Sequence, residues 1–106
     1  MPLRAVGFWR AAIHLDSTDV DSRFNIAFTL QYDLGDVESA LRHWMAASAM
    51  APEDAGIILH GTQALLDLGR TTDAVSWLRR FVDQHPQHPR RQELEAALDT
   101  LRLAAG

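Results

Sequence analysis

Two stretches of the chain repeat one pattern at a distance of 34 residues. The first, LGDVESALRHWMAASAMAP, runs from residue 34 to residue 52, and the second, LGRTTDAVSWLRRFVDQHP, runs from residue 68 to residue 86. Each begins with Leu-Gly, carries an alanine five residues after the glycine, and ends in proline. Glycine accepts the left-handed conformation that often ends a helix, and proline cannot continue one. The sequence therefore indicates a unit of two helices that occurs twice.

The spacing of apolar residues before each Leu-Gly pair also indicates a helix, which would be the first helix of each unit. At an offset of 34, Phe24 aligns with Ile58 and Trp44 with Leu78. Six residues fall within about 120° of a helical wheel, with Gly61 near the centre of the arc: Ile57, Ile58, Gly61, Ala64, Leu65 and Leu68. We therefore expect the wheel's opposite side to face outward, and it carries Leu59, Gln63 and Leu66. The expected N-terminal caps are Asp36, Asp54 and Thr71.

Both ends of the chain extend the array. Residues 5–19 match residues 40–54 at an offset of 35, so we expect residues 3–16 to form the second helix of a repeat whose first helix is missing. Residues 90–104 carry one apolar stripe on an otherwise polar segment, which is typical of a closing helix with a polar outer face. We expect one domain, residues 1–106, with full repeats at 21–54 and 55–88.

Composition excludes several classes of function. The chain has 106 residues, a formal charge of −4, ten arginines, no lysine and no cysteine. Without lysine there is no Schiff-base or P-loop chemistry, and the acidic balance argues against nucleic acid as a partner. No apolar run approaches the roughly 20 residues of a membrane span. The N-terminus lacks a signal-peptide pattern, so we expect a cytoplasmic protein; a periplasmic location stays open if an upstream segment is missing.

Histidines provide the only candidate for metal chemistry. His85 and His88 lie in the segment DQHPQHP with Asp83 nearby, and two histidines with one carboxylate could hold a metal ion. Their spacing is not a recognised ligand signature, and the serines have no strand–turn–helix context for a nucleophile. We therefore expect no enzyme activity, no metal and no cofactor. A metal-dependent regulator or an enzyme that uses His85 and His88 is the alternative of a different class.

The 34-residue unit resembles the tetratricopeptide repeat, a helix–turn–helix module. The turn glycines, the alanines at 40 and 74, and the closing prolines at 52 and 86 carry the resemblance. It implies an all-α solenoid of five or six antiparallel helices in a right-handed superhelix. It also implies that the first helix of each repeat lines a concave groove. The expected groove residues are Asn25, Thr29, Tyr32, Asp33, Leu59, His60, Gln63, Leu66 and Asp67.

These observations predict a protein-interaction module, or scaffold, that binds a peptide or helical segment of another protein in the groove. The arginine-only, alanine-rich composition indicates a bacterial source. In an alternative, the chain is still a protein-interaction module, but its binding site is the N-terminal helix. That helix offers more apolar surface than one neighbouring helix can bury. In that alternative the chain forms a homo-oligomer, such as a homodimer, through Val6, Phe8, Trp9 and Ile13.

Overall fold

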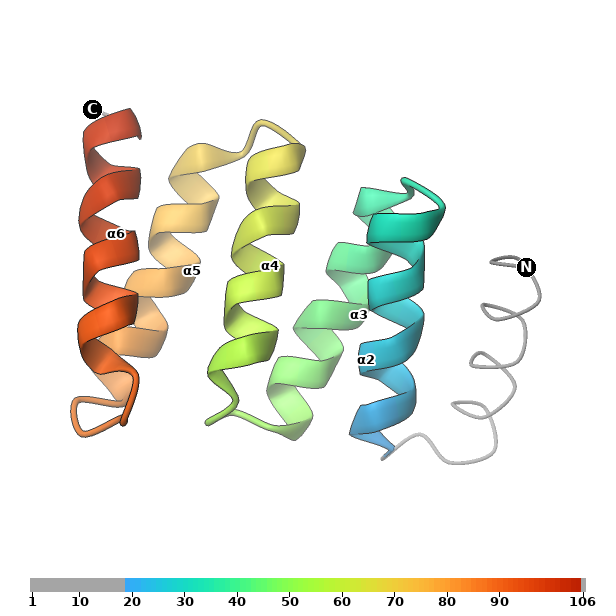
Figure 1. Ribbon diagram of the computed structural model, residues 1–106, viewed down its shortest axis with the longest axis horizontal. Helices are drawn as coiled ribbons and strands as arrows, with labels where there is room; N and C mark the ends of the chain where they lie inside the picture. The colour runs from blue at the N-terminus through green and yellow to red at the C-terminus, as the bar shows by residue number, and fades with distance from the viewer. Residues whose placement is uncertain (1–18, 106) are drawn as a thin grey trace. The chain divides into compact units, whose positions relative to one another are not determined.

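The computed structural model describes residues 19–105, and these residues are helical except at turns and caps. The helices are α2 (Val20–Phe28), continued by a π-helical turn η1 (Thr29–Asp33), then α3 (Val37–Met50), α4 (Ala55–Asp67), α5 (Thr71–Gln84) and α6 (Arg91–Ala105) (Figure 1). Two compact units divide the chain, Met1–Pro52 and Glu53–Gly106. Residues 19–105 contain no strand, which confirms the all-α prediction.

A glycine in the left-handed conformation reverses the chain in each unit. Gly35 has φ +70° between η1 and α3, and Gly69 has φ +74° between α4 and α5. No atom lies within 4 Å of a Cβ added at either glycine, so backbone conformation and not space requires glycine there. Each unit therefore contains one helical hairpin, as the repeated Leu-Gly pairs predict.

Aspartate side chains begin three of the helices. Asp19 accepts a hydrogen bond from the Ser22 amide at 3.1 Å, Asp36 from the Ser39 amide at 3.2 Å, and Asp54 from the Gly56 amide at 2.9 Å. The caps expected at Asp36 and Asp54 are confirmed. The expected cap at Thr71 is wrong.

Thr71 is the first helical residue of α5, and Arg70 occupies the cap position without a side-chain hydrogen bond to the helix. Arginine has no side-chain acceptor for a helix N–H. Instead, Arg70 Nε donates to Asp73 in the first turn at 2.8 Å. A threonine next to the turn was therefore an insufficient signal for the position of the cap.

Trp44 forms the centre of the first unit. Its side chain is fully buried, and Phe24 meets its ring edge-on with ring centroids 5.0 Å apart. The indole N–H donates to Gln31 Oε1 at 2.7 Å, so the buried indole has the partner that it needs. Ala40 and Ala47, both fully buried on the same helix, match the small positions of the predicted repeat.

The closing helix completes the core of the second unit. Leu94 and Leu98 of α6 are buried in one cluster with Leu78 and Phe81 of α5 and Ile58 of α4. We call this set, which also includes Ala55 and Val82, the second-unit core. Helix α6 lies at Arg91–Ala105, close to the closing helix expected at residues 90–104.

Trp77 is closely packed against Gly61. A Cβ added at Gly61 would lie 2.9 Å from Trp77 Cζ2, closer than real Cβ atoms approach. The indole N–H donates to the Ile58 carbonyl oxygen at 2.9 Å, and that oxygen also accepts from the Thr62 hydroxyl at 2.8 Å. The sequence pattern did not reveal that Gly61 makes room for this ring.

The stretch from the N-terminal cap of the first helix to the turn glycine is one residue longer in the first unit than in the second. The glycines are 34 residues apart, whereas the caps Asp19 and Asp54 are 35 apart. At the end of the first helix, the Leu34 amide donates to the Thr29 carbonyl, five residues back, whereas the Leu68 amide donates to Ala64, four residues back. The wider π turn η1 absorbs the additional residue.

The extra residue changes which positions of α2 correspond to α4. At an offset of 35, buried Ile26, Ala27 and Leu30 align with buried Gly61, Thr62 and Leu65, and exposed Phe28 aligns with exposed Gln63. At an offset of 34, exposed Phe28 would align with buried Thr62. The expected alignment of Phe24 with Ile58 is therefore wrong, and Phe24 corresponds to Leu59.

Two expectations stay predictions. The half repeat at residues 3–16 lies outside the described residues. The right-handed superhelix concerns the placement of the units relative to one another, which is not determined.

The contact between Gly61 and Trp77 makes the second unit sensitive to a larger residue at position 61. Gly61→Val should lower the free energy of unfolding by about 1–3 kcal/mol, because the added atoms force the indole from its site. Urea unfolding followed by circular dichroism measures this change. The same substitution in a Trp77→Leu background should cost less. An equal cost in both backgrounds would show that the ring is not the obstacle.

Candidate binding surface on the first helices

A row of aromatic side chains follows α2 and η1. Phe28 and Tyr32 are 42% and 45% exposed, and their ring centroids lie 4.6 Å apart. Phe24, half-buried, stacks on Phe28 at 6.4 Å. We call these three residues the aromatic row. Aromatic side chains can supply both apolar area and, in tyrosine, a hydroxyl for hydrogen bonding.

The predicted groove residues of the first unit divide into two groups. Tyr32 and Asp33 are exposed. Thr29 is only 8% exposed, and Asn25 is half-buried with its amide donating to the Asp21 carbonyl at 2.9 Å. The one-residue shift explains the difference, because it turns positions 25 and 29 away from the face that positions 59 and 63 occupy in α4.

Phe24 and Phe28 were missed for the same reason. The prediction used the 34-residue spacing of the glycines for the first helix as well as the second. The signal that could have found them is the 35-residue spacing of Asp19 and Asp54, since both aspartates cap first helices.

In the second unit, the predicted residues on α4 present a more polar face. Gln63 and Asp67 are exposed, and Gln63 Nε2 donates to Asp67 Oδ1 at 2.8 Å. Leu66 is half-buried. Leu59 is also half-buried and packs against the second-unit core, which includes two leucines of α6. Leu59 therefore contributes to packing in its own unit and is not a fully exposed contact.

His60 is half-buried on α4. Burial lowers the pKa of its imidazole below the ordinary value, because desolvation disfavours the charged form, and the negative charge of Asp54 acts in the opposite direction. The structure thus favours a neutral His60, which can donate and accept hydrogen bonds but does not attract an anion.

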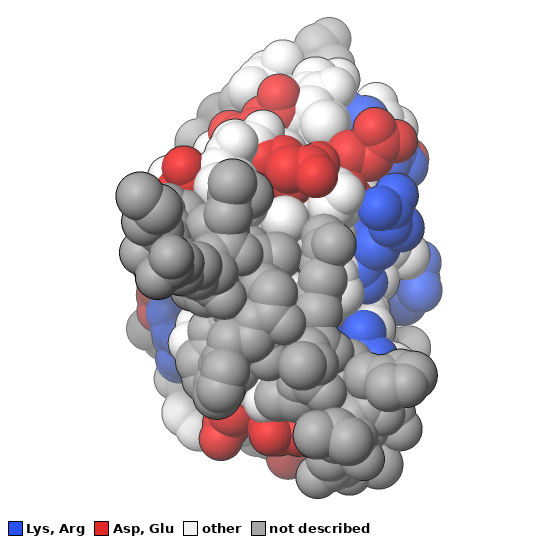
Figure 2. Space-filling model, turned by 90° about the vertical axis from the view of Figure 1, so that its right-hand side faces the viewer, with Lys and Arg blue, Asp and Glu red and all other residues white. Residues whose placement is uncertain are grey.

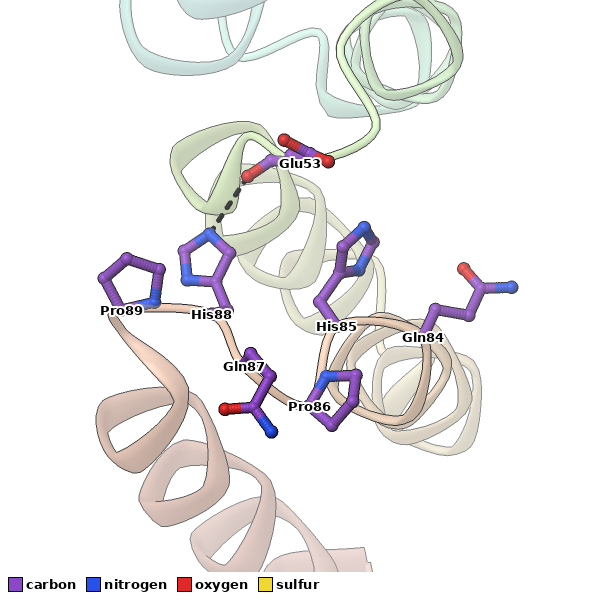
Figure 3. Close-up of a pocket in the computed structure, with 7 residues that line it drawn as sticks. All are labelled: Glu53, Gln84, His85, Pro86, Gln87, His88 and Pro89. Atoms are coloured by element: carbon purple, nitrogen blue, oxygen red, sulfur yellow. Dashed lines mark hydrogen bonds between the residues drawn. The ribbon is translucent and has the colours of Figure 1, made fainter.

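The loop with His85 and His88 borders an open cavity of about 390 Å³ in the second unit, which Glu53 and residues 84–89 line (Figure 3). The Arg90 amide donates to His88 Nδ1 at 3.0 Å, so Nδ1 is an acceptor. Nε2 must then carry the proton that it shares with the Glu53 carbonyl at 3.0 Å. Both ring nitrogens of His88 are therefore engaged.

His85 is also engaged, because Nδ1 contacts the Phe81 carbonyl at 3.0 Å. A metal ion would need ring nitrogens whose lone pairs are available. Three of the four nitrogens in this pair instead make contacts within the protein. No group of three or more potential metal ligands occurs among the residues that the structure describes.

Charge is mixed on the surface. Figure 2 shows both acidic and basic side chains on the face that it draws, and acidic side chains gather near its upper and lower ends. Within residues 19–105, none of the helices is both long enough and apolar enough to cross a bilayer.

The sequence matches a family model described as tetratricopeptide repeat over residues 31–98, well over half of the chain. The chain therefore belongs to the tetratricopeptide repeat family. No curated protein matches it significantly.

Solved structures share the fold. The type III secretion translocator chaperone SycD of Yersinia enterocolitica is similar with a TM-score of 0.81 and 18% identity, over 98% of this chain and 74% of SycD. SycD in complex with a peptide of the translocator YopD has a TM-score of 0.78 and 19% identity, and the match covers 97% of this chain and 78% of SycD. PcrH in complex with the chaperone binding region of PopD has a TM-score of 0.78 and 21% identity, and the match covers 95% of this chain and 78% of PcrH. These similarities show that the chain has the same helical-repeat fold.

Proposed function

We propose that this chain is a non-enzymatic binding module that takes a segment of another protein on the first-helix faces of its hairpins. The observation that carries the proposal is the aromatic row, because Phe28 and Tyr32 lie side by side and keep 42% and 45% of their surface exposed. Exposed apolar side chains that lie together are typical of interaction sites. An amphipathic or extended segment is the kind of ligand that such faces bind.

Family membership and the fold support the same reading. SycD, which shares this fold, has been solved with a peptide of the translocator YopD, and PcrH has been solved with the chaperone binding region of PopD. A binding module needs no reactive group, and three of the four ring nitrogens of His85 and His88 make contacts with other residues of the chain. We place the module in the cytoplasm as part of the proposal, and its partner is a protein segment and not a nucleic acid or a membrane.

Site-specific photo-crosslinking tests this proposal. A benzophenone side chain placed at exposed Gln63 on α4 should cross-link a protein in cells of the source organism. The same group at Arg80, exposed on α5, is the matched control and should give little product. A synthetic copy of the cross-linked segment should then bind the purified chain. Leu59 is unsuitable for this experiment because it packs against the second-unit core.

Equal cross-linking at both positions would contradict the proposal. So would a cross-linked segment that, once synthesised, shows no saturable binding to the purified chain.

A homodimer through residues 3–16 is the second candidate. Its apolar residues Val6, Phe8, Trp9 and Ile13 lie outside the described residues. The observation that favours it is the alternative dimer described for SycD, a structure similar to this chain with a TM-score of 0.76 and 19% identity.

Light scattering of the purified chain tests the homodimer. The wild type should have the mass of a dimer, and Trp9→Asp should halve it, because a buried carboxylate disfavours an apolar interface. The control Leu103→Asp alters a side chain that is 85% exposed on α6 and should leave the mass unchanged. A wild-type monomer would exclude this candidate.

A further inference from the structure

We propose that the aromatic row binds an extended segment that alternates apolar with other residues and carries a lysine or arginine on each side. This inference rests on the proposed function and specifies the chemistry of the partner. It uses three properties of the first unit: the spacing of the rings, the carboxylates at the two ends of the row, and the excess of acidic residues around it.

The spacing of the first two rings of the row fits an extended chain. Residues four apart on a helix rise by about 6 Å, and the ring centroids of Phe24 and Phe28 are 6.4 Å apart. Alternate side chains of an extended strand repeat at about 6.6–6.8 Å. Apolar side chains two positions apart in a partner can therefore lie beside Phe24 and Phe28, whereas the intervening side chain points away. Tyr32, with its ring centroid 4.6 Å from that of Phe28, extends the apolar surface beside the second of these side chains.

Carboxylates flank the row. Asp21 is exposed in the first turn of α2, one helical turn before Phe24, and Asp33 is exposed directly after Tyr32. The three ion pairs found among the described residues all join residues of the second unit, so none of them engages Asp21 or Asp33. Both carboxylates are therefore available to a cationic partner.

The wider charge of the first unit has the same sign. Residues 1–52 contain six acidic side chains and four basic ones, a net charge of −2. Within residues 19–52 there are five acidic side chains (Asp19, Asp21, Asp33, Asp36 and Glu38) and two basic ones (Arg23 and Arg42). Complementary charge on a partner would favour encounter and orientation. A lysine or arginine could also rest on the face of Tyr32 or Phe28.

Helix geometry predicts the distance between the two cationic residues. Asp21 and Asp33 are twelve residues apart, which corresponds to about 18 Å along a regular α-helix and to slightly less here because of the π turn η1. An extended chain covers that distance in about five or six residues at 3.3 Å each. We therefore expect two or three apolar residues between basic residues that are five or six positions apart.

Selection from a random peptide library tests this inference, because it requires no candidate partner. Phage that display random 12-residue peptides are selected on the immobilised full chain, and the enriched peptides are synthesised. Their affinities are measured for the wild type, Phe28→Ser, Tyr32→Ser and the double variant Asp21→Asn/Asp33→Asn. Met45→Ser is the matched control, because Met45 is an exposed apolar residue on α3, 51% exposed. Circular dichroism verifies that each variant is folded.

The enriched peptides should carry alternating apolar residues and the predicted pair of basic residues. Phe28→Ser and Tyr32→Ser should each weaken peptide binding at least about tenfold, because each removes an aromatic ring that the bound peptide would bury. The double Asn variant should weaken it about three- to tenfold and reduce its salt dependence. Met45→Ser should bind like the wild type.

Other outcomes separate the inference from the proposed function. Peptides that bind Phe28→Ser as tightly as the wild type, or that carry flanking acidic residues, would overturn the inference and leave the binding module intact. If no peptide is enriched and the cross-linking at position 63 also fails, both are wrong.

Discussion

The left-handed turn at Gly35 and Gly69 is the constraint on which both hairpins depend. With φ near +70°, the chain leaves the first helix and reverses within a few residues, so that the second helix returns beside the first. Only glycine adopts this conformation at little cost. The close return is compatible with the fully buried alanines Ala40 and Ala74, where larger side chains would separate the paired helices. The chain reversal at glycine and the small alanine side chains thus both allow the two helices of a hairpin to pack closely.

The outward face of the first helix depends on a second constraint, the distance from its cap to that glycine. In α4 the distance suits a regular α-helix, and the outward positions carry Gln63. In α2 one more residue must fit between the same two points, and the π turn accommodates it near Thr29. The residues before the turn are rotated relative to the α4 pattern as a result. Phe28, and not Thr29, faces outward, so a change in backbone geometry determines the chemistry of the surface.

The sequence predicted the hairpins, two of three expected caps and the closing helix, because glycine, proline, aspartate and apolar spacing act locally. It predicted Tyr32 but not Phe24 and Phe28 of the aromatic row, since an insertion absorbed inside a helix creates no loop and leaves only the 35-residue spacing of the caps. It also missed the contact of Gly61 with Trp77, which depends on how two helices pack. Local preferences therefore defined the elements, and packing between elements determined which side chains are available for binding.

The rotation of α2 can be measured directly because the chain has no native cysteine. Single cysteines at positions 28 and 29, and at the equivalent positions 63 and 64 of α4, can be labelled with a thiol reagent under native conditions. The account predicts fast labelling at 28 and 63, and slow labelling at 29 and 64. Fast labelling at 29 with protection at 28 would restore the 34-residue alignment and contradict the assignment of the aromatic row to the outer face.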